Sequence, residues 1–548
     1  MDRNQGSRES RPTKLCHYQS APSFDFARGI TEKGGRNLTK QDEAIPQFAV
    51  SNRGVNLDDA RMRSGLNEAT TPAANRGPHV MKRLPVQFLL AWTLSLGGCA
   101  HYPVNAPLAS AAPETGYRFN NLSHANNSDS LFVVLAFSGG GTRAAALSYG
   151  VLEELAKTEI VWEGERRRLL DEVDLISSVS GGSFTAAYYA LYGDRIFCDF
   201  ESSFLKRNVQ GRLLALYSSP INWVRLASPK FSRIDMAAEY YDRHLFGRHT
   251  FHDLLALGRR PFLMINATDM SLGSRFEFTQ DQFDLLCSDL SSFPLSRAVA
   301  ASSAFPILLS PLTLRNYAGS CDSPEPGWVQ STLMDASAPT RRRNQALEAR
   351  AYLDSTNRPF IHLLDGGLAD DLGLRGPLEG IVTRENAGRG MPWFQVDQIR
   401  KVVLVVVNAS VAPDEGVDRR EKSPGLREVA EAAGRVPISR YSFETVELFK
   451  ETVEKWQREI NQRRQSTTAP ASAASGGSAG KSLLEQLQFY PIEVNFDALS
   501  DETERKFFKK LPTSFKLPPE TVDRLRAVAA RLLRQSENYQ KLLRELNR

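Results

Sequence analysis

Short, uninterrupted runs of apolar residues recur between residues 131 and 410, and turn-forming or polar residues bound each of them. The clearest run is Leu131–Phe137, with the sequence LFVVLAF. Runs of this length that end at turn formers are typical of buried strands. Similar runs are VDLISSVS (residues 173–180), PFLMINATDM (261–270), FIHLLDGG (360–367) and VVLVVVNAS (402–410).

Helical patterns separate these apolar runs. A glycine-rich stretch at residues 138–141 opens into the sequence TRAAALSYGVLEELAK, and the segment FTAAYYALYG follows the second run. Apolar strands that alternate with helices are typical of a largely parallel sheet with helices on both faces. We therefore predict an α/β fold of three layers, α/β/α, with a central and mostly parallel sheet over residues 128–412.

The pattern becomes mainly helical beyond about residue 425. The stretch PPETVDRLRAVAARLLRQSENYQKLLREL closes the chain with regularly spaced leucines, and its proline pair suits the first turn of a helix. Residues 466–480 are rich in Ala, Ser and Gly, which predicts a low-complexity loop. We predict a mainly helical C-terminal region over residues 413–548.

Composition excludes some classes of function. The 548 residues are too many for one ordinary domain. Lys and Arg number 68 against 63 Asp and Glu, and no long run of one sign appears. So small and dispersed an excess does not form a basic footprint for nucleic acid, and we predict no such partner. The five cysteines show no CxxC spacing and no nearby histidine, so we predict no zinc site.

The segment MKRLPVQFLLAWTLSLGGCA, which begins at Met81, has the layout of a secretory signal peptide. Lys82 and Arg83 form a short positive region, and residues 84–96 form an apolar core too short to span a bilayer as a helix. The small residues before Cys99 complete a sequence that resembles a bacterial lipobox. The resemblance implies a lipoprotein signal peptide at residues 81–98 and a lipid on Cys99. A core helix with an incidental cysteine is the alternative.

Residues 1–80 precede this signal, although a signal peptide acts at the start of a chain. They are polar and show no sustained period, which predicts disorder. Translation that begins at Met81 is the simplest account, and an additional disordered arm is the alternative. After the signal, a Pro/Ala-rich stretch without periodicity predicts a tether over residues 99–127.

Four serines, Ser177, Ser178, Ser180 and Ser183, lie where the second apolar run meets a helical pattern. A reactive serine on a tight strand-to-helix turn needs small residues two positions before and two positions after it. Ser180 alone meets this condition, because Ser178 and Gly182 flank it at those distances. The pattern by itself is also compatible with a Ser/Gly-rich connection that has no chemistry.

Gly139, Gly140 and Gly141 lie between a predicted strand and a predicted helix. Amide groups at a helix N-terminus carry partial positive charge and can stabilise the oxyanion that forms when an ester carbonyl is attacked. The same loop, with Ala144, also fits the dinucleotide-binding pattern G-x-G-x-x-G/A, and Glu163 lies near the distance of a ribose-binding acid. The loop alone leaves both an oxyanion hole and a cofactor site open.

Asp365 ends the predicted strand FIHLL, and Gly366 and Gly367 follow it. Functional residues collect at the carboxyl edge of the strands in α/β sheets. The glycine pair lets the chain turn away sharply, so we predict that Asp365 faces a site. A helix cap or a turn former is the alternative. Asp370 and Asp371 have no such glycine pair, and we expect substitutions there to have modest effects.

Taken together, these motifs resemble those of the patatin-like phospholipases. GGGTR at residues 139–143, SVSGG at 178–182 and DGG at 365–367 occur in the order and context of that family. The resemblance covers roughly residues 131–408. Ser178 departs from it, because it stands in place of the first glycine of the family's serine turn.

The resemblance implies catalysis by a Ser-Asp dyad without a histidine. Ser180 would attack the acyl carbonyl, Asp365 would accept its proton as general base, and Gly139, Gly140 and Gly141 would form the oxyanion hole. The resemblance also implies supporting roles for Gly182, Gly366, Gly367 and Arg143, with Arg143 either steadying the oxyanion loop or meeting a lipid phosphate.

We therefore predict a serine acyl hydrolase that cleaves ester bonds of phospholipids or lysophospholipids without a cofactor or metal. Its predicted partner is a membrane surface, reached through the lipid anchor at Cys99. Its predicted location is the bacterial cell envelope, at the outer membrane facing the periplasm, because Ala100 and not Asp follows the cysteine. Two alternatives stay open: a nucleotide-binding oxidoreductase that uses the Gly139 loop, and a catalytically silent envelope protein with the same fold.

Overall fold

The computed structural model describes residues 100–112, 114–123, 127–306, 308–322, 324–379, 398–412, 416–467 and 487–547. The predicted segment 1–80, the predicted signal peptide 81–98 and Cys99 therefore lie outside the described residues. Most of the predicted loop 466–480 also lies outside them, and its residues 466 and 467 belong to the end of a long helix.

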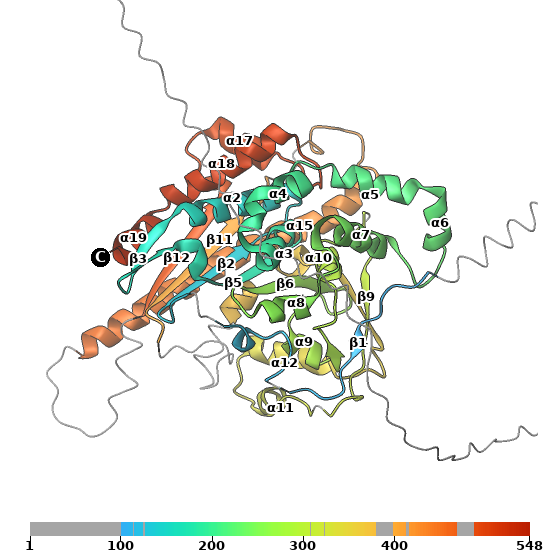
Figure 1. Ribbon diagram of the computed structural model, residues 1–548, viewed down its shortest axis with the longest axis horizontal. Coiled ribbons are helices and arrows are strands. Elements are labelled where there is room, and N and C mark those ends of the chain that lie inside the picture. Colours follow the sequence, from blue (N-terminus) through green and yellow to red (C-terminus); the bar gives the residue numbers. More distant parts are fainter. Residues whose placement is uncertain are drawn as a thin grey trace, which may run out of the picture. The chain divides into compact units, whose positions relative to one another are not determined.

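A mixed sheet of eight strands lies at the centre of the fold (Figure 1). Five neighbouring strands run parallel to one another, whereas β10 runs antiparallel to β6, and β9 and β7 also pair antiparallel with their neighbours. Across the sheet the strands are β12 (Gln488–Asn495), β11 (Lys401–Asn408), β2 (Leu131–Phe137), β5 (Val173–Val179), β6 (Phe262–Asp269), β10 (Phe360–Asp365) and β9 (Leu312–Arg315), with β7 (Arg275–Glu277) paired to β6.

Helices and two short strand pairs complete the described part of the chain. In chain order these elements are β1 (Ala106–Pro107), η1 (Phe119–Asn121), α2 (Thr142–Lys157), β3 (Glu159–Trp162), β4 (Glu165–Arg168), η2 (Leu169–Glu172), α3 (Gly181–Tyr192), η3 (Gly193–Arg195), α4 (Ile196–Phe200), η4 (Glu201–Leu205), α5 (Val209–Ser218), α6 (Pro220–Leu226), α7 (Arg233–Tyr241), η5 (Asp242–Phe246), α8 (Phe251–Leu257), α9 (Gln280–Asp284), β8 (Ser288–Asp289), α10 (Leu295–Ser302), α11 (Gly327–Met334), α12 (Thr340–Tyr352), α13 (Gly367–Asp370), α15 (Leu426–Thr467), η6 (Phe496–Ala498), α17 (Glu502–Lys509), α18 (Pro519–Gln535) and α19 (Glu537–Leu546).

Every residue of β2, β5, β6 and β11 is buried. Helices cover both faces of these strands, so neither face needs polar side chains and the sequence reads as continuous apolar runs. The parallel centre of the sheet and the helices on both faces give the α/β fold that the sequence predicts.

Two neighbouring residues of β12 show that helices cover both faces of the sheet. The Phe489 ring stacks on Trp456 of α15, with ring centroids 4.9 Å apart. The hydroxyl of Tyr490, the next residue, donates a hydrogen bond to Glu545 of α19. Successive side chains of a strand point to opposite faces, so α15 and α19 lie on opposite sides of the sheet.

The C-terminal region is mainly helical, as the sequence predicts, and it also contributes an unpredicted strand to the central sheet. β12 pairs in parallel with β11 along its whole length. α18 packs so closely on α2 that a Cβ atom on Gly150 would lie 2.6 Å from the carbonyl oxygen of Arg526. The sequence conceals this strand because Pro491 interrupts it, and a proline is tolerated where β12 forms the edge of the sheet. Residue 412 is therefore not a domain boundary in the structure.

The segment predicted as a tether, residues 99–127, packs on the fold wherever it is described. Tyr117 is buried and stacks on Phe262 of β6 at 4.8 Å between ring centroids. At the start of the described chain, the carbonyl oxygen of Ala100 accepts a hydrogen bond of 2.6 Å from the Ser228 hydroxyl. A few aromatic anchors in a Pro/Ala-rich stretch are enough to fix it, and they leave no periodic signal.

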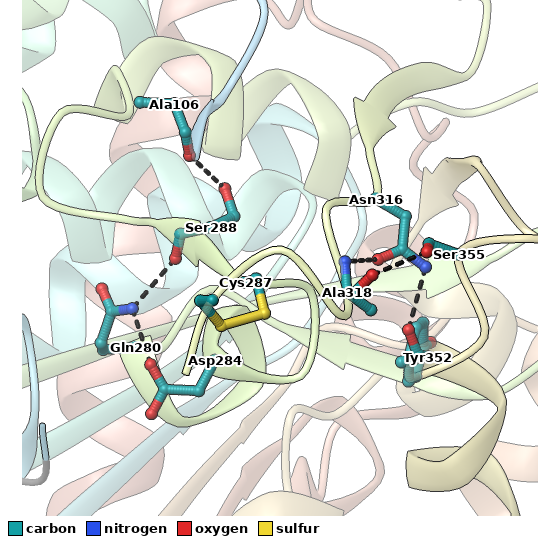
Figure 2. Close-up of a disulfide and its surroundings, with 10 residues drawn as sticks. Ala106, Gln280, Asp284, Cys287, Ser288, Asn316, Ala318, Tyr352 and Ser355 are labelled. Carbon is teal, nitrogen blue, oxygen red and sulfur yellow. Dashed lines mark hydrogen bonds between the residues drawn. A yellow bond between two sulfur atoms is a disulfide. The ribbon is translucent and has the colours of Figure 1, made fainter. Parts of the chain in front are cut away.

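A disulfide joins Cys287 and Cys321, a pairing that the cysteine spacing does not predict (Figure 2). It links the turn after α9 to the loop after β9. The Gln280 side chain donates to the carbonyl oxygen of Ser288 at 3.0 Å, and the Asn316 side chain binds backbone groups on the other side. The bond thus fastens two loops that hydrogen bonds already order.

Among the described helices, none combines the length and the apolar character that crossing a bilayer requires.

Candidate active site

Ser180 lies on the sharp turn between β5 and α3. Its backbone φ is +49°, a value that L-residues with side chains rarely adopt. Such strained positions persist where the surrounding structure enforces them, and they cluster at functional sites. The strand-to-helix turn that the sequence predicts is therefore present, and Ser180 is the serine at its apex.

Close contacts with β2 and the glycine loop explain the small residues after Ser180. A Cβ atom on Gly182 would lie 2.7 Å from the Ser138 carbonyl oxygen, and one on Gly181 would lie 2.1 Å from the carbonyl oxygen of Gly141. The sequence argument placed weight on Gly182 but missed Gly181. A side chain at Gly181 is excluded by Gly141, which lies 40 residues earlier in the chain.

Ser180 and Asp365 form a direct hydrogen bond. The Ser180 hydroxyl donates to Asp365 Oδ2 at 2.9 Å, and Asp365 Oδ1 accepts from the backbone N–H of Gly367 at 2.9 Å. Burial, the largest influence, raises the pKa of Asp365 to about 6, although both hydrogen bonds act in the opposite direction. The carboxyl group is therefore mainly ionised at neutral pH and can accept a proton.

The reversed direction of β10 brings Asp365 level with Ser180. Asp365 pairs with Ala267 of β6, next to Asn266, which pairs with Val179 at the end of β5. The chain then turns at Gly366, where a Cβ atom would lie 2.3 Å from the Asn266 carbonyl oxygen. Asp365 thus reaches the carboxyl edge of the parallel strands although its own strand is antiparallel to them.

Ser302, at the end of α10, holds the turn at Ser180 in place through hydrogen bonds. Its hydroxyl accepts from the backbone N–H of Ser180 at 2.9 Å and donates to the Asn266 carbonyl oxygen at 2.6 Å. It also lies 3.0 Å from the hydroxyl of Ser183. The sequence analysis missed Ser302. It considered Ser183 as a nucleophile candidate, and in the structure Ser183 is buried with its hydroxyl next to that of Ser302. The one local signal for Ser302 is that it lies in the small-residue stretch SRAVAASSAFP.

The glycine loop lies against Ser180, and two of its three residues have positive φ: +133° at Gly140 and +60° at Gly141. A Cβ atom on Gly139 would lie 3.3 Å from the Ser180 Cβ. The Gly139 N–H donates to the Asp371 carbonyl oxygen at 2.8 Å. In the part of the chain that the structure describes, the N–H groups of Gly140 and Gly141 have no acceptor. These two amides, and not that of Gly139, are available to an oxyanion.

Arg143 holds the glycine loop in place. The guanidinium group donates to the carbonyl oxygens of Ala409 (2.8 Å) and Leu511 (2.7 Å) and to the hydroxyl of Thr513 (3.2 Å). The side chain is buried, and burial lowers its pKa to about 10. Of the two roles that the sequence leaves open, the geometry supports steadying the loop, because all three nitrogens point at protein acceptors.

Asp371 is a second buried carboxylate beside the dyad. A Cβ atom on Gly139 would lie 2.3 Å from Asp371 Oδ1, and one on Gly367 would lie 2.8 Å from the same oxygen. Burial raises the pKa of Asp371 to about 7, and the negative charge of Asp365 adds to the rise. The sequence analysis gave this residue little weight, because nothing local to it shows that α13 turns it towards the glycine loop.

His362 and the acidic residue of the cofactor alternative, Glu163, lie away from the dyad. His362 is exposed on β10, where its Nδ1 lies 3.1 Å from the Thr313 hydroxyl. Glu163 accepts from the Ser130 hydroxyl at 2.8 Å, next to the start of β2. The glycine loop follows the end of β2, about 20 Å away for a strand of this length. Glu163 therefore cannot bind the ribose of a nucleotide held by that loop. In the described ranges no group of acidic, histidine or cysteine side chains is arranged to hold a metal ion.

Part of the chain matches a known protein family. Residues 135–377 match the family model described as patatin-like phospholipase. No curated protein matches the chain. Similar solved structures include human GIVD cytosolic phospholipase A2, with 13% identity, a TM-score of 0.37 and coverage of 76% of this chain and 62% of that one. VipD from Legionella pneumophila is another, with 11% identity, a TM-score of 0.23 and coverage of 78% and 71%.

The fold and the family match define a patatin-like α/β protein with a mixed central sheet between helices. The family match is confined to residues 135–377, which carry the motifs that resemble the patatin-like phospholipases. The chain spans about 62% of the length of the human phospholipase A2 structure.

Proposed function

We propose that this protein is a serine acyl hydrolase that cleaves ester bonds of phospholipids or lysophospholipids. The hydrogen bond of 2.9 Å between Ser180 and Asp365, at a turn held in a strained conformation, is the observation that carries the proposal. The family match supports lipid hydrolysis as the general activity.

The proposed reaction begins when Ser180 Oγ attacks the ester carbonyl while its proton passes to Asp365 Oδ2. The oxyanion that forms accepts hydrogen bonds from the N–H groups of Gly140 and Gly141. Collapse of the intermediate releases the alcohol, which takes the proton from Asp365, and leaves an acyl group on Ser180. Asp365 then accepts a proton from a water molecule whose oxygen attacks the acyl carbonyl. The bond between this carbon and Ser180 Oγ breaks, Asp365 returns the proton to Ser180 Oγ, and the fatty acid leaves.

The environment of Asp365 suits a general base. A base works best when its pKa lies near the working pH, and burial raises the pKa of Asp365 to about 6. The hydrogen bond from Gly367 orients one oxygen, which leaves the other directed at Ser180.

We also propose that the protein is a lipid-anchored component of the bacterial cell envelope, at the outer membrane facing the periplasm. The lipobox-like sequence that ends at Cys99 supports the anchor. The disulfide between Cys287 and Cys321 supports an oxidising compartment, because disulfides rarely persist in the cytoplasm. Mass spectrometry of the mature protein tests the anchor. A diacylated Cys99 at the N-terminus is expected, and an unmodified Cys99 still joined to residues 81–98 would contradict it.

The test of the activity is hydrolysis of a panel of phospholipids, lysophospholipids and short-chain esters, with the Ser180→Ala variant as control. A fluorophosphonate probe should label Ser180, and the variant should lose both label and hydrolysis, by a factor on the order of 10⁶ in turnover. Labelling of Ser183 in place of Ser180 would contradict the assignment. A folded protein with neither label nor activity would favour the silent envelope protein.

A further inference from the structure

We propose that the helical hairpin α5–α6, with the cavity beside it, is a docking surface for an anionic phospholipid bilayer. The proposal concerns binding and not hydrolysis, so it stands independently of the catalytic function proposed for Ser180 and Asp365. Figure 1 shows α5 and α6 beyond α7, at a distance from the central strands.

The hairpin exposes an apolar patch. The exposed fractions are 48% for Leu214, 77% for Ile221 and 58% for Trp223. α6 has no buried residue at all, whereas α5 packs through Val209 and Leu213. Single exposed apolar residues are normal, but large ones that share two adjacent helices mark an interaction site. Tryptophan and aliphatic side chains together suit the boundary between headgroups and acyl chains.

The same part of the chain is strongly basic. Residues 206–248 contain eight Lys and Arg against three Asp and Glu, an excess equal to that of the whole chain. Two of the three acidic groups form ion pairs: Asp235 with Arg297 at 2.7 Å, and Glu239 with Arg225 at 2.5 Å. Lys206 is also paired, with Glu201 at 2.7 Å and with Asp523 at 2.8 Å, so the free positive charge belongs to the other basic residues of the stretch. The positive charge that remains is complementary to a surface of phosphate groups.

A cavity of about 740 Å³ lies between α5, α6 and α7, and Arg207, Arg212 and Arg243 contribute to its lining. Within the described ranges the guanidinium groups of these three arginines form no ion pair or hydrogen bond. Tyr240 also lines the cavity, and its buried hydroxyl has no partner in the same ranges. Unpaired guanidinium groups around a cavity suit a phosphate headgroup, which arginine binds through paired N–H donors.

The first described residue, Ala100, lies just past the end of this hairpin. Ala100 is hydrogen-bonded to Ser228, two residues after α6 ends. In Figure 1 the blue start of the described chain passes beside α6. Cys99 directly precedes Ala100 in the sequence, so the predicted lipid would act together with this surface, because an acyl anchor and a basic patch bind more firmly together than either does alone.

The base of the hairpin contacts the active-site loop. The Gln210 N–H donates to the Phe515 carbonyl oxygen at 3.2 Å, and the Phe515 N–H donates to the Gln210 side chain at 3.1 Å. The neighbouring residue, Ser514, accepts from the N–H of Thr142 in the glycine loop at 2.9 Å. The base of the hairpin is thus connected to the glycine loop through residues 514 and 515.

The test is co-sedimentation of the full chain with vesicles, in a background that carries Cys99→Ser and Ser180→Ala to remove the lipid and the hydrolysis. Vesicles of phosphatidylglycerol and phosphatidylcholine in equal parts should bind, and added salt should weaken the binding. The triple variant R207Q/R212Q/R243Q should lose affinity on the order of 100-fold, since each basic residue near an anionic surface contributes about fivefold.

Two matched controls distinguish binding by this particular surface from a general effect of the protein's net charge. The triple variant R166Q/R350Q/R458Q removes the same charge from exposed positions elsewhere and should lose about threefold at most. W223A should weaken binding, whereas W328A, at another exposed tryptophan, should not. If the first triple variant does not fold, its three single variants, each expected to lose about fivefold, replace it.

Equal binding to phosphatidylcholine vesicles alone, or equal losses in the two triple variants, would overturn the proposal. In the background that keeps Ser180, R207Q/R212Q/R243Q should hydrolyse a soluble short-chain ester as fast as the parent. Vesicle binding without any hydrolysis would leave the docking surface in place and reject the catalytic proposal instead.

Discussion

The N–H of Thr142 donates to the carbonyl oxygen of Ser514 at 2.9 Å, and this bond ties the glycine loop to a segment more than 370 residues later in the chain. Gly141 forms an isolated bridge with the same Ser514. Leu511 and Thr513 accept hydrogen bonds from Arg143 in the same loop. The C-terminal residues therefore contact the glycine loop of the candidate site, although they lie outside residues 135–377, which match the family model.

This contact predicts that Gly141→Ala will inactivate the enzyme. A Cβ atom there would lie 2.4 Å from the Ser514 carbonyl oxygen, and the φ of +60° already disfavours alanine. We expect a loss of about 2–4 kcal/mol in the free energy of unfolding and a large fall in kcat/KM. Gly273→Ala is the control, because Gly273 has a φ of +66° but no atom within 4 Å of the added Cβ. It should cost about 1–2 kcal/mol and leave kcat/KM unchanged. Equal effects on activity would contradict the argument.

The raised pKa of Asp365 predicts the acid limb of the pH profile. The value of about 6 means that kcat/KM should fall tenfold per pH unit below pH 6, as the base becomes protonated. Asp365→Asn should lower kcat by a factor on the order of 10⁴ or more at every pH. A profile that stays flat down to pH 5 would exclude Asp365 as the base.

The raised pKa of Asp365 also predicts that the folded state becomes more stable at low pH, where the activity falls. Because the folded state holds the proton more tightly than the unfolded state, whose pKa is near 3.8, the folded protein is favoured below pH 4 and loses this stabilisation as the pH rises to about 6. Asp365→Asn removes the ionised group, so its melting temperature at pH 7 should exceed that of the parent. Equal melting temperatures at pH 7 would show that burial does not penalise this carboxylate.

Asp371 should govern the alkaline side of the profile. Its carboxyl group lies against Gly139 and has a pKa of about 7, above that of Asp365. When it ionises, a negative charge beside the glycine loop opposes the oxyanion, so kcat/KM should decline above about pH 7. Asp371→Asn should remove this decline and leave the acid limb near pH 6 in place. Asp370→Asn, a change at the neighbouring residue that accepts from the N–H of Arg375, should keep both limbs. A decline that persists in Asp371→Asn would reject the assignment.

The predictable parts of this molecule are those with local signals. Buried parallel strands such as β2 and β11 can be recognised in the sequence as apolar runs, because helices cover both of their faces. The turn at Ser180 and the strand end at Asp365 are visible because glycines must follow each of them closely. The family resemblance joined the two motifs, and the structure brings their side chains within hydrogen-bonding distance.

The parts that sequence reasoning missed depend on contacts between distant positions. Ser302 supports Ser180 from 122 residues away, and nothing near Ser302 reveals that its hydroxyl faces the turn. β12 buries only alternate residues and contains an internal proline, so its sequence shows no continuous apolar run. Asp371 follows Asp365 closely, but its proximity to Gly139 depends on how α13 packs.

The disulfide offers a prediction that separates stability from catalysis. Cys287 and Cys321 are 34 residues apart, and closing a loop of this size stabilises a protein by about 2–4 kcal/mol through the unfolded chain. The double variant Cys287→Ser/Cys321→Ser should therefore melt at a lower temperature, while its kcat/KM at 25 °C stays close to that of the parent, because neither cysteine contacts Ser180, Asp365 or the glycine loop. A reducing agent should lower the melting temperature of the parent and leave the double variant unchanged. If the reducing agent affects both proteins equally, the stabilisation does not come from this bond.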